Sequence, residues 1–163
     1  MRALFVLILL FPLQSRAAQV GDPAPVFKLP RLDTETVFSS ESLAGRVTYL
    51  DFWASWCGPC RVSFPEIIKL KADLGDKPFE VVAISVDEDP EDAMRFLKRY
   101  ETSYPILIDS AGKTAGAYEL PGMPTSFIID GSGVIRERHE GFKPGDMKAI
   151  REKIEQLLIE APR

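Results

Sequence analysis

The chain has 163 residues, of which 45% are hydrophobic and 27% are charged, and its formal net charge at neutral pH is −4. An acidic chain without a basic cluster does not favour nucleic acid or anionic lipid as a partner. It contains one histidine and two cysteines, which leaves too few of these ligands to favour a zinc site.

Residues 1–17 have the features of a secretory signal. Arg2 supplies a positive charge, residues 3–13 form an almost unbroken apolar run, and small residues precede a cleavage point after Ala17. The run of about 11 residues is shorter than the roughly 20 that a membrane-spanning helix needs. We therefore expect a cleaved signal rather than an uncleaved membrane anchor, and a mature domain at residues 18–163 in the periplasm or another extracytoplasmic compartment.

The order of apolar segments predicts an α/β domain with a mixed central sheet. Runs rich in β-branched and aromatic residues predict strands, and the two most apolar runs are typical of buried parallel strands. Strands are expected at residues 26–29, 36–38, 47–53, 80–86, 106–108, 125–129 and 134–140. Helices are expected from near residue 57 to 74 and at 91–100, 112–118 and 146–159, with one helical turn at 39–43. This order places helices on both faces of the sheet, and the absence of repeats and linkers predicts one domain.

The two cysteines, Cys57 and Cys60, are separated by only two residues. A disulfide between them closes a small loop and constrains the unfolded chain much less than a long-loop bridge does. Disulfide exchange requires a thiolate, and a helix N-terminus lowers the pKa of a cysteine through its unpaired N–H groups and its dipole. We therefore predict a redox pair in which Cys57 attacks the substrate and Cys60 resolves the mixed disulfide.

Three motifs carry a resemblance to a known family. The run Asp51-Phe52-Trp53-Ala54-Ser55-Trp56-Cys57-Gly58-Pro59-Cys60 resembles the active-site strand and turn of thioredoxin. Pro65 matches the proline that kinks the following helix in that superfamily, and Gly122-Met123-Pro124-Thr125 resembles its cis-proline loop. The leader, the first hairpin and the extra helix and strand from residue 91 are similar to the TlpA/ResA branch. The resemblance extends from about Val20 to the C-terminus.

The resemblance implies a thioredoxin-like fold with an N-terminal hairpin and a central helix–strand insertion. It implies an exported protein-disulfide reductase that needs no cofactor or metal, with a cis bond before Pro124. The residues that it places beside the substrate are Trp56, Gly58, Pro59, Met123 and Pro124. Several members of the TlpA/ResA branch serve cytochrome c maturation, so the implied partners are apocytochrome c, or else a copper-delivery protein, and a membrane thiol transporter as electron donor.

Asp51 is a lone carboxylate within the apolar run at residues 47–53. A charge is costly there, and acids with perturbed pKa values cluster at working sites. The matching aspartate of thioredoxin lies beneath the second cysteine and moves its proton, so we expect Asp51 to serve Cys60. The alternative is an aspartate held by a structural hydrogen bond or a lysine. Many TlpA/ResA relatives have glutamate at the position of Ser63 and asparagine at that of Asp51, so their substrate preferences are not transferred.

Two other functions compete with a reductase. A thiol peroxidase needs a threonine three residues before its attacking cysteine, where this chain has Ala54. A non-catalytic binding or chaperone module for thiol proteins would need none of Cys57, Cys60 and Asp51. The Gly-Pro pair between the cysteines is that of thioredoxin, whose potential of about −270 mV is reducing. A reductase is therefore the favoured hypothesis.

Overall fold

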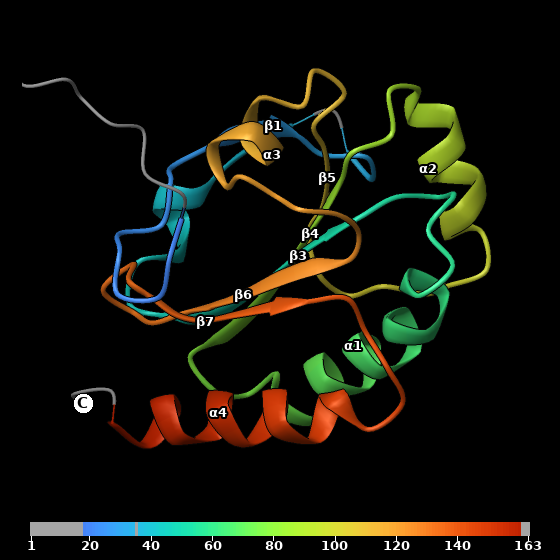
Figure 1. Ribbon diagram of the computed structural model, residues 1–163. Coiled ribbons are helices and arrows are strands. Elements are labelled where there is room, and N and C mark those ends of the chain that lie inside the picture. The colour runs from blue at the N-terminus through green and yellow to red at the C-terminus, as the bar shows by residue number, and fades with distance from the viewer. Residues whose placement is uncertain (1–17, 35, 161–163) are drawn as a thin grey trace, which may run out of the picture.

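The computed structural model describes residues 18–34 and 36–160, so the expected signal at 1–17 lies outside the described part. Within that part, no helix is both long enough and apolar enough to span a bilayer. A five-stranded mixed sheet forms the centre of the molecule (Figure 1). In spatial order its strands are β5 (Ile106–Ile108), β4 (Phe79–Ser85), β3 (Val47–Trp53), β6 (Thr125–Ile129) and β7 (Ile135–Glu140).

Strand β3 is the middle strand, and all of its residues are buried. It runs parallel to β4, which is parallel to β5, whereas β6 is antiparallel to both of its neighbours. Because consecutive side chains of a strand point to opposite faces, β3 divides the interior into two cores. Tyr49 and Trp53 face one core, and Leu50 and Phe52 face the other. Because it is two residues from each of Tyr49 and Trp53, the Asp51 side chain points to the same face of the sheet as theirs.

Helices cover both faces of the sheet, as the sequence predicted. In Figure 1, α1 (Cys60–Leu74) and α4 (Asp146–Glu160) lie along one face, and α3 (Lys113–Ala117) lies on the other. The N-terminal hairpin of β1 (Lys28–Pro30) and β2 (Val37–Ser39) packs on the side of α3 together with the 3-10 helix η1 (Ser40–Leu43). Helix α2 (Pro90–Leu97) contributes Phe96 to the core beneath α1.

The element boundaries follow the expectations closely in the sheet and less closely elsewhere. The strands expected at 47–53, 106–108 and 125–129 are confirmed without a shift. The first hairpin strand begins at Lys28 because the N–H of Phe27 donates to the Ser40 hydroxyl group, not to a strand partner. Helix α2 begins at Pro90, one residue before the expected start, behind an Asp89 side chain that accepts from the Glu91 N–H, and it ends at Leu97 and not at residue 100.

Candidate active site

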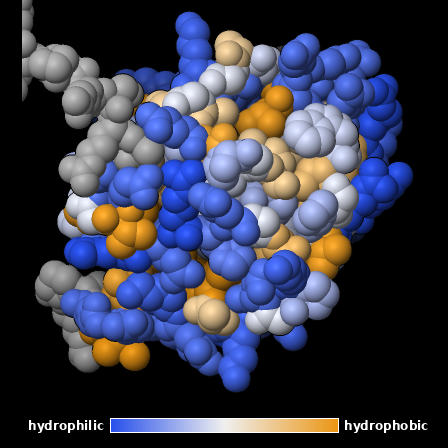
Figure 2. Space-filling view, in the orientation of Figure 1, coloured by the Kyte–Doolittle hydropathy of each residue, from blue (hydrophilic) through white to orange (hydrophobic). Residues whose placement is uncertain are grey.

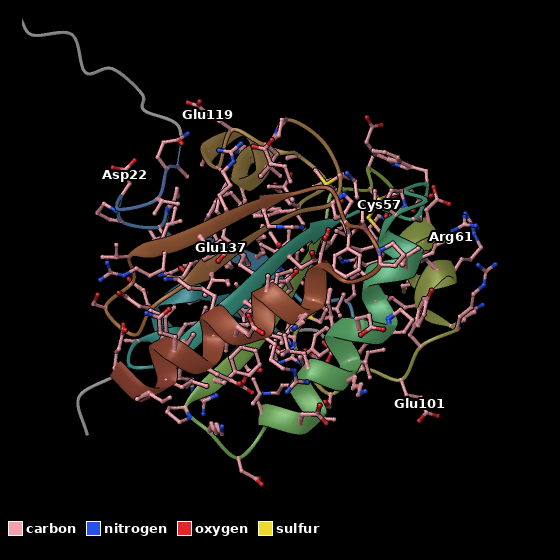
Figure 3. The ribbon with its side chains drawn as sticks, turned by 60° about the horizontal axis from the view of Figure 1, so that its bottom comes forward. Asp22, Cys57, Arg61, Glu101, Glu119 and Glu137 are labelled. Carbon is pink, nitrogen blue, oxygen red and sulfur yellow. A yellow bond between two sulfur atoms is a disulfide. The ribbon has the colours of Figure 1, made fainter. Side chains whose placement is uncertain are left out.

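The two cysteines form a disulfide at the N-terminal end of α1 (Figure 3), with their Cα atoms 5.3 Å apart. The expectation that the helix begins near residue 57 is wrong, because Cys60 is its first residue. Cys57 lies in the preceding turn, where its N–H donates to the Ala54 carbonyl oxygen. The first residue of the helix still stabilises a negative charge on Cys57, since the N–H of Cys60 donates to the Sγ atom of Cys57 at 3.2 Å. The helix N-terminus is therefore aimed at the sulfur atom of Cys57.

The disulfide is almost completely enclosed by the protein. Only 3% of Cys57 is exposed, and none of Cys60. Gly58 and Pro59 between them are exposed, and Trp56 beside them is 68% exposed. A substrate sulfur atom can therefore approach the pair at Cys57, next to Trp56, and not at Cys60.

The surface around this end of α1 contains apolar side chains. Val62, two residues beyond Cys60, is exposed like Trp56. Figure 2 shows apolar and weakly polar residues gathered toward the side of this face on which α1 begins and α2 lies, with polar residues around them. Arg61 is also exposed and points away from the body of the molecule near Cys57 (Figure 3). An unfolded or extended polypeptide could make apolar contacts here.

The loop before β6 approaches the same end of the sheet. The Met123–Pro124 bond is cis, as the sequence predicted. Thr125 pairs with Phe52 near the end of β3, which places this loop beside the turn that leads to the cysteines. The Thr125 hydroxyl group donates to the Gly122 carbonyl oxygen at 2.7 Å and fixes the loop from within. Met123 is partly buried and packs against both cores.

A buried carboxylate that the sequence analysis did not single out holds the turn before Cys57. Asp87 accepts hydrogen bonds from the backbone N–H of Ser55 at 3.0 Å and from its hydroxyl group at 2.8 Å. It also accepts from the Ser85 hydroxyl group at 2.7 Å. The signal in the sequence is a polar Ser85 and Asp87 directly at the end of a strand parallel to β3. Carboxyl ends of parallel strands meet at one edge of a sheet, so these groups were candidates for the active-site turn.

Asp51 is fully buried beneath the active-site helix, in the core that also contains Cys60. Its Oδ2 atom has no hydrogen-bond partner among the described residues. Burial raises the pKa of Asp51 from 3.8 to about 8. Neither of the structural alternatives, a lysine or a hydrogen bond to Oδ2, is present in the described part of the chain.

Ser63 differs from Asp51 in both position and chemistry. It lies within α1, is buried, and donates its hydroxyl hydrogen to the Cys60 carbonyl oxygen at 3.2 Å. This bond satisfies the hydroxyl group locally. Within residues 18–34 and 36–160, no three His, Cys, Asp or Glu side chains come together in a way that could hold a metal ion.

Comparison with known proteins gives consistent matches to this site and fold. Residues 19–158 match the Redoxin family model. The thiol-disulfide oxidoreductase ResA of Bacillus cereus is 32% identical over 120 residues, which are 74% of this chain and 69% of that protein. The thiol:disulfide interchange protein HelX of Rhodobacter capsulatus is 34% identical over 143 residues, 86% of this chain and 78% of that protein. A solved structure from Chlorobium tepidum, described as a thiol:disulfide interchange protein DsbE, has a TM-score of 0.83 and 42% identity and covers 87% of this chain and 99% of its own.

Proposed function

We propose that this chain reduces disulfides of other proteins outside the cytoplasm. The proposal proceeds from its family: the chain belongs to the Redoxin family and is a thiol-disulfide oxidoreductase. The observation that carries the proposal is the asymmetry of the cysteine pair. Cys57 keeps a small exposed area, 3%, and its sulfur atom accepts a hydrogen bond from the helix N-terminus, whereas Cys60 is fully buried on the face that holds Asp51. One sulfur atom is thus equipped to meet a substrate and the other to act inside the protein.

In the proposed reaction the dithiol form begins with a thiolate at Cys57 and a thiol at Cys60. The Cys57 sulfur atom attacks one sulfur atom of the substrate disulfide, and the other substrate sulfur leaves and takes a proton from solvent. The Cys60 thiol then gives its proton to Asp51 and attacks the Cys57 sulfur atom. This step breaks the mixed disulfide and releases the second substrate thiolate, which is protonated in turn. Two electrons have passed to the substrate, and the cysteines are joined as in the structure.

Asp51 suits this role because its pKa of about 8 lies near the physiological range. A general base is most effective when its pKa is close to the working pH. An ordinary exposed aspartate would be too weak a base to take a proton from a thiol. The buried carboxyl group and the buried thiol are expected to titrate as a coupled pair.

The finer assignments rest on the sequence. The expected signal at residues 1–17 supports an extracytoplasmic location. The resemblance to the TlpA/ResA branch supports apocytochrome c as the first candidate substrate, in cytochrome c maturation, and a copper-delivery protein as the second. A reductase in an oxidising compartment needs a supply of electrons, and a membrane thiol transporter is the proposed donor.

Insulin reduction in the presence of dithiothreitol tests the activity, with hydrogen peroxide as a parallel substrate. We expect turnover of insulin that depends on both cysteines, and a midpoint potential against glutathione near that of thioredoxin, about −270 mV. Binding of reduced insulin without turnover would indicate a chaperone module, and preferential turnover of peroxide would indicate a peroxidase. A potential close to about −120 mV would make the protein an oxidant and would contradict the proposed direction.

A further inference from the structure

Three buried polar atoms in the core beneath α1 have no hydrogen-bond partner among the described residues. They are the Oδ2 atom of Asp51, the Nε1 atom of Trp53 and the hydroxyl group of Tyr104. Trp53 and Tyr104 both belong to the core that contains Cys60. Buried polar groups in native proteins are almost always paired, with protein or with ordered water. These three atoms are of complementary type and lie in one core, and a buried water molecule typically has two to four polar partners.

The sheet register and the packing of the core place Tyr104 on the same side of the sheet as Asp51. Asp51 on β3 is level with Ala83 on β4, which is level with Ile106 on β5. Tyr104 lies in the bend two residues before Ile106, one step along the sheet toward Tyr49, and packs in the same core as Ile106. The carbonyl oxygen of Pro105 accepts from the Ala83 N–H at 3.0 Å, which fixes the segment of Tyr104 against this row.

The electrostatic environment is consistent with this proximity. Burial raises the pKa of Tyr104, and the Asp51 carboxylate raises it further, so the Tyr104 hydroxyl group stays protonated throughout the working pH range. Tyr49, next to Asp51 on the same face of β3, has its pKa raised by the same two causes. A protonated tyrosine hydroxyl group can donate a hydrogen bond to a carboxylate, directly or through a water molecule.

Few other titratable groups face Asp51. The strands on either side present Ala83 and Ser126, and α1 presents the thiol of Cys60. The buried residues of α4 are all apolar, namely Met147, Ile150, Ile154 and Leu157. The buried residues of α2 are Ala93 and Phe96. Two strands away, β7 adds His139, in the row of Asp51 and paired with Asp146 at 3.1 Å, and Glu137, in the row of Tyr49. Beyond Cys60, the titratable groups on this face of the sheet are therefore Tyr49, Tyr104, Glu137 and His139.

We propose that Tyr104 is a positioning residue for Asp51: its hydroxyl group and the Trp53 indole N–H hold one water molecule against the Asp51 carboxyl group and set how firmly that group keeps its proton. The consequence for catalysis rests on the proposed function, in which Asp51 takes the proton of Cys60. Hydrogen bonds to an ionised carboxylate favour the ionised form. Tyr104 thereby makes a deeply buried acid usable near neutral pH.

The test compares Tyr104→Phe with a matched variant on the opposite face of the sheet. Tyr118→Phe also removes one buried hydroxyl group, which donates to the Pro25 carbonyl oxygen at 2.9 Å. The pKa of Asp51 is measured in the oxidised proteins by titrating side-chain carboxyl ¹³C resonances, with Asp51→Asn to assign the signal. Tyr104→Phe should raise the pKa of Asp51 by about one unit, whereas Tyr118→Phe should leave it unchanged. An unchanged or lowered pKa in Tyr104→Phe would overturn the proposal.

The pH profile of insulin reduction provides a second readout that a structural defect would not move. Tyr104→Phe should slow reduction by up to about tenfold at pH 7, with the deficit closing as the pH rises past the shifted pKa. A structural defect would slow the reaction by the same factor at every pH, and that result would count against the proposal. If Asp51→Asn turns over normally while Tyr104→Phe still shifts the Asp51 resonance, the pairing stands and the proton-transfer role of Asp51 fails.

Discussion

The two faces of the central sheet treat their buried polar groups differently. On the face away from α1, the Tyr118 hydroxyl group is satisfied by the Pro25 carbonyl oxygen, within an otherwise apolar core around Leu50 and Phe52. On the face beneath α1, the Oδ2 atom of Asp51 and the hydroxyl group of Tyr104 are buried without a hydrogen-bond partner in the part of the chain that the structure describes. Unpaired buried polar groups cost stability. One strand, β3, thus contributes stability on one face and holds a costly, reactive group on the other.

Loss of Cys57 should give the largest effect on the reactive side. Cys57→Ser removes the attacking thiol, so insulin reduction should fall to the rate of dithiothreitol alone. Under reducing conditions the free energy of unfolding should change by no more than about 2 kcal/mol, because one small buried group is exchanged for another. Denaturant titration measures the free energy of unfolding, and the turbidity of precipitating reduced insulin measures the rate of reduction. Residual catalysis by this variant would show that Cys60 can attack substrate unaided.

Loss of Phe52 should give the opposite pattern. Its ring contacts those of Tyr118 and Phe127, at centroid distances of 5.1 and 6.1 Å, on the face without redox groups. Phe52→Ala should destabilise the protein by about 3 to 5 kcal/mol through the cavity that it leaves. At a temperature where the variant remains folded, its midpoint potential should match that of the parent. A shifted potential would show that the two faces are not independent.

Replacement of Asp51 should have a smaller effect on stability, of opposite sign. The unfolded chain ionises this group near its ordinary pKa of 3.8, and the folded protein ionises it near 8. The fold therefore loses stability as the pH rises between these two values and keeps the full penalty above pH 8. Asp51→Asn should be more stable than the parent by about 3 kcal/mol at pH 9, after the cost of an unpaired amide, and less stable than the parent by that cost, about 2 to 3 kcal/mol, below pH 4. Its reduction of insulin at pH 7 should be at least about tenfold slower.

Ser63→Ala is the matched control for Asp51→Asn, and its effect should be the smallest. Ser63 is as buried as Asp51, but its hydroxyl group is satisfied by the Cys60 carbonyl oxygen within the same helix. Stability should change by less than about 1 kcal/mol, without pH dependence between pH 4 and 9. Turnover should stay within about twofold of the parent, since a serine has no proton to exchange in this range. A large loss in this variant would move the proton-transfer role from the strand to the helix.

The sequence was sufficient for the parts of this arrangement that depend on local pattern. Strand β3 was predicted without error because residues 47–53 are almost all apolar or β-branched, and the cysteine motif identified the chemistry. The start of α1 was predicted wrongly because Pro59 already has helical dihedral angles, φ −61° and ψ −27°, so the boundary depends on hydrogen bonds and not on residue type. Asp87 had a signal in the sequence, since it follows a strand expected to be parallel to β3, but its bond to Ser55 joins segments distant in sequence. The place of Tyr104 depends on packing between such segments, for which no local signal exists.

The central claim is that Cys57 meets the substrate while Cys60 works from inside the protein. Trapping of the intermediate tests it most directly. Reduced Cys60→Ser and Cys57→Ser proteins are mixed with a disulfide-bonded substrate, quenched with acid and analysed by mass spectrometry. Cys60→Ser should accumulate a mixed disulfide at Cys57, because the buried thiol that resolves it is gone, and Cys57→Ser should remain free. Accumulation of the adduct in Cys57→Ser instead would reverse the roles of the two cysteines and contradict the account.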